Sequence, residues 1–254
     1  MLNYTDLKEL ADDKWLELDS GDKPWIRIGT AICGKAAGAD QVFNEIHSVL
    51  NELKIDSHVD EVGCMGICFA EPLLDIKLPN KGRVFFKNVS PKDVSSIIQS
   101  FIVNKTIEHP SILGVVDEID ENLPSLNDLP GIRYQKKIAL SNAGNISPYN
   151  LYQYVSQGGY LALNKALNGM SQEEVIKEIS ESGLRGRGGA AFPTGFKWSF
   201  LVKSSSSAKY ILCNCEEGDP GAYNDKGILE SDPFKLLEGL TIAGYATGAT
   251  NGIV

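Results

Sequence analysis

The chain has 254 residues, of which 43% are apolar and 22% charged, so it is long enough to bury a sizeable core in about two domains. Acidic side chains outnumber basic ones by 33 to 24, and the net charge of −9 argues against nucleic acid or an anionic membrane as the main partner. The sequence shows neither a signal peptide nor an apolar run of membrane-spanning length, which favours a cytoplasmic protein without a direct membrane span.

The first hundred residues predict alternating strands and helices. A strand at 25–30 is followed by a helix at 40–53, whose apolar side chains fall on one face. Further extended segments precede a helix that begins with Ser90 as N-cap and Pro91 in its first turn. These segments cover residues 58–62, 73–78 and 83–89, and the turn-forming sequence PNKG joins the last two into a hairpin.

These elements indicate that residues 1–103 form one α/β domain, to which we assign the order βαββα. Residues 104–131 lose the periodicity, contain three prolines and carry an acidic run, which is typical of a linker. A second domain then occupies residues 132–254. Within it, the dipeptide Ser147-Pro148 predicts a helix start, and the capping box of Ser171 begins a helix that ends at Gly183.

The segment that follows, GLRGRGGAAFPTGFKW at 183–198, contains five glycines and three basic residues. Glycine leaves the backbone bare and basic side chains attract anions, so a phosphate is the first ligand to consider. The pattern Gly186-x-Gly188-x-x-Ala191 satisfies the loose dinucleotide fingerprint, but that motif lies between a strand and a helix, whereas a capped helix precedes this loop. The segment also lacks the Gly-Lys-Ser/Thr ending of a Walker loop.

Aromatic side chains interleave with these glycines, at Phe192, Phe196, Trp198 and Phe200. Bare amides beside flat apolar faces suit a phosphorylated ligand that carries rings, a nucleotide or a flavin, better than a simple anion. The alternative is a glycine-rich surface loop whose arginines are solvated. Composition alone leaves both interpretations open.

The five cysteines form two groups. Cys33 follows the first strand and Cys64 the next, so both loops lie at one edge of the sheet if these strands are parallel neighbours. Cys68 then adds a third thiolate to the same site, whereas a [2Fe–2S] cluster normally takes four. Cys213 and Cys215 follow a strand predicted in the second domain, and because two cysteines cannot close a usual metal site we interpret them as buried strand-end thiols.

The second half of the chain resembles a known family. The segments that carry the resemblance are SGLRGRGGAAFPTGFKWSF and CNCEEGDPGAYNDKGILESDPFKLLEGLTIAGYATGA. They are similar to the flavin-bearing, NADH-oxidising subunit of respiratory complex I and of NAD-linked hydrogenases and formate dehydrogenases. The resemblance covers about residues 132–254 and implies the first part of the complex I flavoprotein-type FMN-binding α/β fold. Residues 23–103 resemble the thioredoxin-like iron–sulfur domain of the hydrogenase-type members.

The resemblance implies FMN as a cofactor, which accepts a hydride and releases electrons singly. It implies that the FMN phosphate lies near the glycine loop and Lys197. Asn214, Glu216 and Glu217 would surround the rest of the cofactor. Without the resemblance, these acidic residues would be interpreted as a solvated turn.

The resemblance also implies NADH, bound over the same loop. By analogy, Phe192 and Phe200 stack on the adenine, and Asp219, where the family more often has glutamate, contacts the nicotinamide end. The implied cofactor-binding residues are Gly186, Arg187, Gly188, Gly189, Phe192, Gly195, Lys197, Phe200, Asn214, Glu216, Glu217 and Asp219.

The iron–sulfur ligands depart from the family pattern. In the family a second cysteine stands five positions after the first, and that place is Gly38 here. Either the [2Fe–2S] cluster is lost, which leaves a scaffold for docking, or a fourth ligand joins Cys33, Cys64 and Cys68 from elsewhere. His58 is a weak candidate for that fourth ligand.

The family further implies partners. These are a thioredoxin-like [2Fe–2S] subunit and other iron–sulfur subunits of a complex to which a membrane part can be attached. The chain ends at ATNGIV, where the family continues into the rest of the flavin fold, so we expect the missing C-terminal half as a partner. The first hypothesis is therefore an NADH:acceptor oxidoreductase subunit. The second is a catalytically silent fragment that acts as a docking or assembly module.

Overall fold

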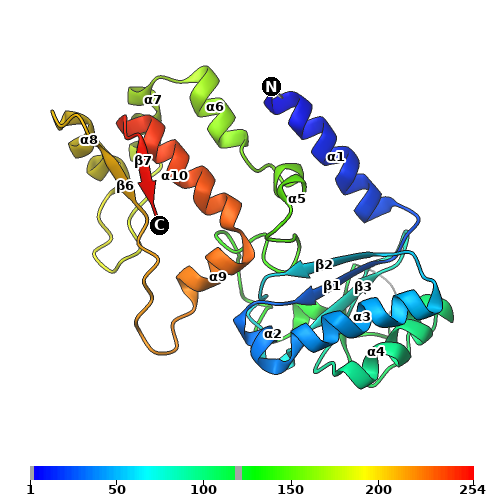
Figure 1. The fold of residues 1–254 in the computed structure, drawn as a ribbon. Helices are drawn as coiled ribbons and strands as arrows, with labels where there is room; N and C mark the ends of the chain where they lie inside the picture. Colours follow the sequence, from blue (N-terminus) through cyan, green and yellow to red (C-terminus); the bar gives the residue numbers. More distant parts are fainter. Residues whose placement is uncertain (1–2, 118–121) are drawn as a thin grey trace.

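The computed structural model describes residues 3–117 and 122–254 (Figure 1). Its N-terminal part is built around a five-stranded sheet with the strand order β2-β1-β3-β4-β5. β1 pairs in parallel with β2, as expected, and β3 and β4 form the expected hairpin. The strands are β1 (Trp25–Gly29), β2 (His58–Val62), β3 (Leu74–Lys77), β4 (Arg83–Phe86) and β5 (Ile112–Val116).

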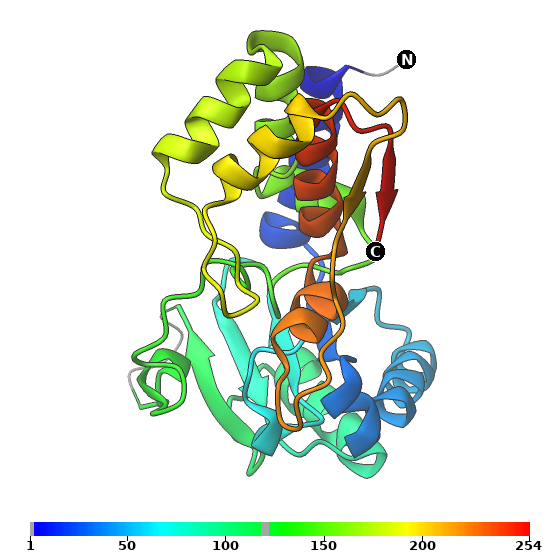
Figure 2. The same ribbon diagram turned by 90° about the vertical axis from the view of Figure 1, so that its left-hand side faces the viewer.

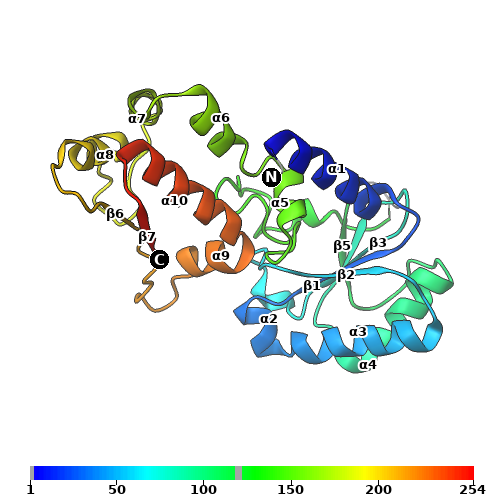
Figure 3. The same cartoon turned by 45° about the horizontal axis from the view of Figure 1, so that its top comes forward.

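Helices cover one face of this sheet (Figures 1 and 3). They are α2 (Ile32–Ala37), α3 (Ala39–Leu53) and α4 (Pro91–Ile98), and α4 continues into a π-type turn at Gln99–Val103. Alternate strand residues such as Ile26, Ile76 and Phe86 point into a buried cluster with the apolar faces of α3 and α4. The predicted cap of α4 is confirmed, because Ser90 and Asp93 form a capping box there.

Two of the sequence-based expectations for this region are wrong. Three strands, not the two of the predicted βαββα order, lie between α3 and α4. The segment 104–131, expected as a linker, contributes β5, which pairs antiparallel with β4 and continues the same sheet. The prolines and acidic residues around β5 hid this strand, because it is only five residues long.

The opposite face of the sheet carries a buried ion-pair cluster. Asp75 bridges Arg27 and Arg83 with N–O distances of 2.8 Å, and all three side chains are almost fully buried. Arg83 also donates hydrogen bonds to Asn145 Oδ1 (2.6 Å) and to the backbone oxygen of Gly144 (2.7 Å). Residues of the C-terminal part therefore pack directly on the N-terminal sheet.

The acidic N-terminal leader forms α1 (Tyr4–Ser20) and lies beside α5 (Leu151–Ser156) (Figures 1 and 3). Tyr4 donates a hydrogen bond to the backbone oxygen of Gly159 (3.1 Å), and Lys14 lies over the ring of Tyr152 (4.8 Å). Sequence-distant segments thus join the two parts of the chain. The limit of the first domain at residue 103 is therefore too early, because β5 belongs to its sheet, and the second domain at 132–254 stays a prediction.

Helices dominate the C-terminal part. They are α5, α6 (Leu161–Gly169), α7 (Gln172–Glu181), α8 (Thr194–Lys203), α9 (Asn224–Ser231) and α10 (Pro233–Thr247). β6 (Tyr210–Leu212) pairs in parallel with β7 (Asn251–Ile253). Side chains from α6, α7 and α10 form a small buried cluster.

Of the two helix starts predicted in this part, one is confirmed and one is displaced. The capping box at Ser171 is confirmed. α5, however, begins at Leu151 instead of following Ser147-Pro148, because the side chain of Asn150 accepts the first free amides of that helix. Across residues 3–117 and 122–254, no helix is long and apolar enough to cross a membrane.

Candidate functional site

The glycine loop, the segment between α7 and α8, is exposed and folds back on itself like a hairpin. Its base is closed by backbone hydrogen bonds from Gly186 N to the oxygen of Phe192 and from Thr194 N to the oxygen of Leu184, both 2.9 Å long. Arg185 donates to the oxygen of Ala191 (3.1 Å) across the loop. The loop is thus held in shape by its own backbone, while residues 181–190 all stay exposed.

The loop runs directly into the N-terminus of α8. Sequence reasoning rejected a phosphate motif because a helix precedes the loop, and it missed that a helix also follows, at Thr194. The signal for this helix was Pro193, since proline is common at the start of helices. Helix N-termini present unpaired backbone amides and a partial positive charge, so the loop and α8 together can bind an anion.

Glycines in the loop leave the backbone open to a ligand. A side chain added at Gly188 or Gly189 would meet no atom within 4 Å, and Gly186 has only loose neighbours. Gly195 differs, because it is buried and a side chain there would collide with Ser180 of α7 at 2.1 Å. The loop glycines therefore leave room for a ligand, whereas Gly195 allows α7 and α8 to pack closely.

Three phenylalanines form an exposed aromatic cluster beside the loop. Phe196 and Phe200 lie edge to face with ring centroids 4.6 Å apart, and Phe192 lies 5.9 and 6.5 Å from them. Their side chains are 43 to 54% exposed, which is unusual for such large apolar groups. Lys197 lies exposed in the first turn of α8, and Arg187 is exposed in the loop.

The residues that follow β6 form a second loop, and a side chain within it shapes its turn. The side chain of Asn214 accepts a hydrogen bond from the amide of Glu216 (2.9 Å), which shapes the turn. Glu216 and Asp219 are exposed. Both loops extend in the same direction from α8 and β6 (Figures 1 and 2).

Glu217 caps the N-terminus of α9. Its carboxylate accepts hydrogen bonds from the backbone amides of Asn224, Asp225 (3.1 Å) and Lys226 (3.1 Å). Desolvation alone would raise the pKa of Glu217, but these hydrogen bonds outweigh it and hold the pKa below its usual value. Glu217 therefore has a structural role, and its place beside a cofactor stays a prediction. No local capping motif in the sequence indicates this cap, because Glu217 lies seven residues before Asn224.

The structure brings the predicted cofactor residues together only in part. Within the described residues, no hydrogen bond, ion pair or ring contact joins the glycine loop to residues 214–219. Cys213 and Cys215 lie beside that second loop with their sulfur atoms 3.5 Å apart, and both are half-buried, less than the buried strand-end thiols we expected. Burial raises the pKa of Cys213 to about 11.

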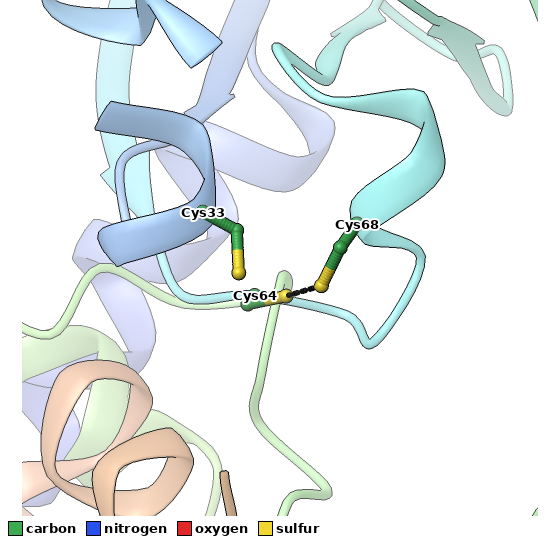
Figure 4. A group of neighbouring side chains, drawn as sticks. All are labelled: Cys33, Cys64 and Cys68. Atoms are coloured by element: carbon green, nitrogen blue, oxygen red, sulfur yellow. Dashed lines mark hydrogen bonds between the residues drawn. The ribbon is translucent and has the colours of Figure 1, made fainter. Parts of the chain in front are cut away.

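Three cysteines converge at the edge of the N-terminal sheet, as predicted from the parallel strands (Figure 4). The sulfur atoms of Cys33, Cys64 and Cys68 all lie within 4.8 Å of one another, and those of Cys64 and Cys68 are 3.8 Å apart. Burial raises the pKa of Cys64 to about 12, although a hydrogen bond from the amide of Gly66 opposes the shift. Burial also raises the pKa of Cys33 to about 11, with a further contribution from Cys68.

The fourth position of this site has no matching thiol. Gly38 ends α2 with φ of 104°, a left-handed conformation that favours glycine over cysteine. His58 is wrong as a fourth ligand, because it pairs with Trp25 at the start of β2, whereas Val62 at the other end of that strand leads to Cys64. Four strand steps separate the two ends by about 13 Å.

A cavity of about 310 Å³ opens beside the three thiols. The N-terminal part contributes the cysteines and Met65, and the C-terminal part contributes Lys137, Lys226 and Glu230. Lys137 donates to the backbone oxygen of Met65 (2.9 Å), and the amide of Ile32 donates to Glu230 (3.2 Å). Burial lowers the pKa of Lys137. The thiol site therefore lies at the junction of the two parts, which sequence reasoning did not indicate.

Comparisons with known proteins find similarity to subunits of redox enzymes. Residues 179–254 match the Nuo51 FMN-binding domain family. An NADH-quinone oxidoreductase subunit of Rhizobium meliloti is 45% identical over 117 residues, which cover 46% of this chain and 28% of that protein. An NADP-reducing hydrogenase subunit of Solidesulfovibrio fructosivorans is 45% identical over 120 residues, 47% of this chain and 24% of that protein. The chain thus spans about a quarter of the length of these relatives.

Solved structures give weaker likenesses. A thioredoxin-like [2Fe–2S] ferredoxin from Aquifex aeolicus aligns with 36% of this chain and 97% of its own, at 16% identity and a TM-score of 0.32. An NAD⁺-reducing [NiFe]-hydrogenase in the air-oxidised state aligns with 99% of this chain and 43% of its own, at 18% identity and a TM-score of 0.38.

Proposed function

We propose that this protein supplies part of the site where NADH reduces FMN, because residues 179–254 match the Nuo51 FMN-binding domain family. The activity is that of an NADH:acceptor oxidoreductase subunit within a multisubunit complex. Iron–sulfur subunits complete that complex. The related proteins carry the names of NADH-quinone oxidoreductase and hydrogenase subunits, which supports this class of reaction.

The observation that carries the proposal is the bare loop at the N-terminus of α8. Space within 4 Å of Gly188 and Gly189 is open, so a ligand can approach their backbone amides. The Thr194 amide already donates to Leu184, but the next amides of the first turn of α8 and the exposed ammonium of Lys197 add positive charge at the end of the loop. These residues fit the phosphate end of FMN, and a doubly charged phosphate would gain most from them.

Aromatic faces provide the second part of the fit. Phe192, Phe196 and Phe200 expose their rings beside the loop, so adenine can stack there without displacing buried side chains. Stacking would exclude water from one face of the dinucleotide and orient it over the bare backbone. When FMN is bound, it supplies the acceptor for a hydride and a donor of single electrons.

The second loop has a supporting role in this proposal. The side chains of Asn214, Glu216 and Asp219 are exposed and therefore accessible to a ligand. Glu217 instead holds the start of α9, so it acts by fixing the path of the loop. The glycine loop and the second loop lie on the same side of the molecule (Figure 2), and a ligand between them would complete the site.

The thioredoxin-like character of the N-terminal part is also a proposal. The parallel β1–β2 pair, the antiparallel β3–β4 hairpin and the helices on one face support it. A [2Fe–2S] cluster fits less well, because three thiols are present where such a cluster takes four. We therefore derive no electron-transfer step through this site.

The test is anaerobic reduction of the FMN-loaded protein by NADH. We expect the visible flavin band to bleach on addition of NADH and to return on addition of an artificial electron acceptor. Failure to bleach while FMN stays bound would overturn the NADH site but not the FMN site. Failure to bind FMN at all would instead favour the second hypothesis, a docking or assembly module.

A further inference from the structure

The three thiols are arranged for one metal ion. A tetrahedral zinc site with Zn–S bonds of about 2.3 Å has its sulfur atoms about 3.8 Å apart. Cys64 and Cys68 already show a separation of 3.8 Å, and Cys33 lies within 4.8 Å of both. In a two-iron cluster, by contrast, the thiolates are divided between two metals and must spread over a longer span. To bind one ion, the Cys33 side chain must rotate only slightly toward the sulfur atoms of Cys64 and Cys68.

We propose that Cys33, Cys64 and Cys68 bind a single Zn²⁺ ion, whose fourth position faces the cavity between the two parts of the chain. Binding releases three protons and forms three Zn–S bonds without any change of oxidation state. The resulting centre carries one net negative charge. Lys137 and Lys226 line the same cavity and balance that charge.

The position of the ion affects how the two parts of the chain pack together. Cys33 lies in the first turn of α2 and the other two thiols follow β2, so the ion ties α2 to the segment after β2. The same cavity is closed by the contacts of Glu230 with Ile32 and of Lys137 with Met65, which join the two parts of the chain. The negative charge of the metal centre attracts Lys137 and Lys226 of the C-terminal part, so metal binding stabilises the junction. This inference does not depend on the proposed flavin chemistry.

The experiment is an anaerobic Co²⁺ titration of the reduced, flavin-free full chain, followed by competition with Zn²⁺. We expect one Co²⁺ per chain, with thiolate-to-cobalt charge-transfer bands and the visible bands of a tetrahedral site, all lost on addition of one Zn²⁺. Cys33→Ser should weaken binding by more than about 100-fold, because it removes a ligand and not merely an outer contact. The matched control is the double variant Cys213→Ser with Cys215→Ser, which should bind normally.

A second measurement uses the unaltered protein and so does not depend on folding of the variants. One equivalent of Zn²⁺ should protect Cys33, Cys64 and Cys68 from alkylation and leave Cys213 and Cys215 reactive, as read by peptide mass. Equal alkylation of all five thiols would overturn the proposal. So would unchanged Co²⁺ binding by Cys33→Ser, or reconstitution that places two iron and two sulfide ions at these three cysteines.

Discussion

Gly195 and Gly188 lie in the same glycine-rich segment but should respond differently to alanine. At Gly195 an added Cβ would lie 2.1 Å from the hydroxyl oxygen of Ser180, 2.8 Å from its backbone nitrogen and 2.9 Å from its Cα. The Ser180 side chain can rotate away, but its backbone cannot, so α7 and α8 must separate. Forced overpacking of this kind costs about 1–3 kcal/mol in the free energy of unfolding.

At Gly188 the same added methyl group meets no atom within 4 Å. The free energy of unfolding should therefore change by less than about 0.5 kcal/mol, as for other exposed positions. If FMN lies against this backbone, however, the methyl group occupies its space. We expect Gly188→Ala to weaken FMN binding at least about tenfold, which corresponds to roughly 1.4 kcal/mol.

The assay pairs urea denaturation with FMN titration for both variants. Gly195→Ala should lose stability and, because it displaces α8, FMN affinity as well, whereas Gly188→Ala should lose only FMN affinity. Equal FMN affinity in Gly188→Ala and the unaltered protein would refute the role of the bare backbone. A fully stable Gly195→Ala protein would refute the packing argument for that glycine.

Three further predictions follow from individual side chains. Lys197→Ala should weaken FMN binding roughly fivefold, as expected for one exposed charge pair, whereas Lys203→Ala at the far end of α8 should leave it unchanged in the same titration. Asp75→Ala should cost about 3–5 kcal/mol in urea denaturation, because it leaves two buried guanidinium groups without their shared carboxylate. Burial raises the pKa of Glu71 to about 7 from 4.5, so the folded state should lose stability as the pH rises between these values. Glu71→Gln should remove that loss and be more stable than the unaltered protein by roughly 3 kcal/mol above pH 7, and identical pH profiles would contradict this.

Local sequence signals identified many elements correctly. The capping residues Ser90 and Ser171 and the turn PNKG predicted their helices and hairpin, because caps and turns depend on side chains within a few positions. Convergence of Cys33 and Cys64 also followed from one rule about parallel strands. In each case the determining contacts lie within a few residues of one another or within one β–α–β unit.

Features set by distant contacts were missed. β5 was missed because prolines and acidic residues surround this short apolar segment, and its place in the sheet is set by pairing with β4. The burial of Gly195 depends on Ser180 of the preceding helix, and the cap of α9 by Glu217 spans a loop. The cavity beside the thiols requires the two parts of the chain to be packed together. Residues 118–121, within the predicted linker, lie outside the described residues.

The most direct test of the flavin site compares FMN with riboflavin, which lacks the phosphate, in equilibrium dialysis against the unaltered chain. Because the loop and the N-terminus of α8 act on the phosphate, we predict one FMN per chain and an affinity at least about tenfold higher for FMN than for riboflavin. Equal affinities for the two flavins, or no binding of FMN, would contradict the assignment.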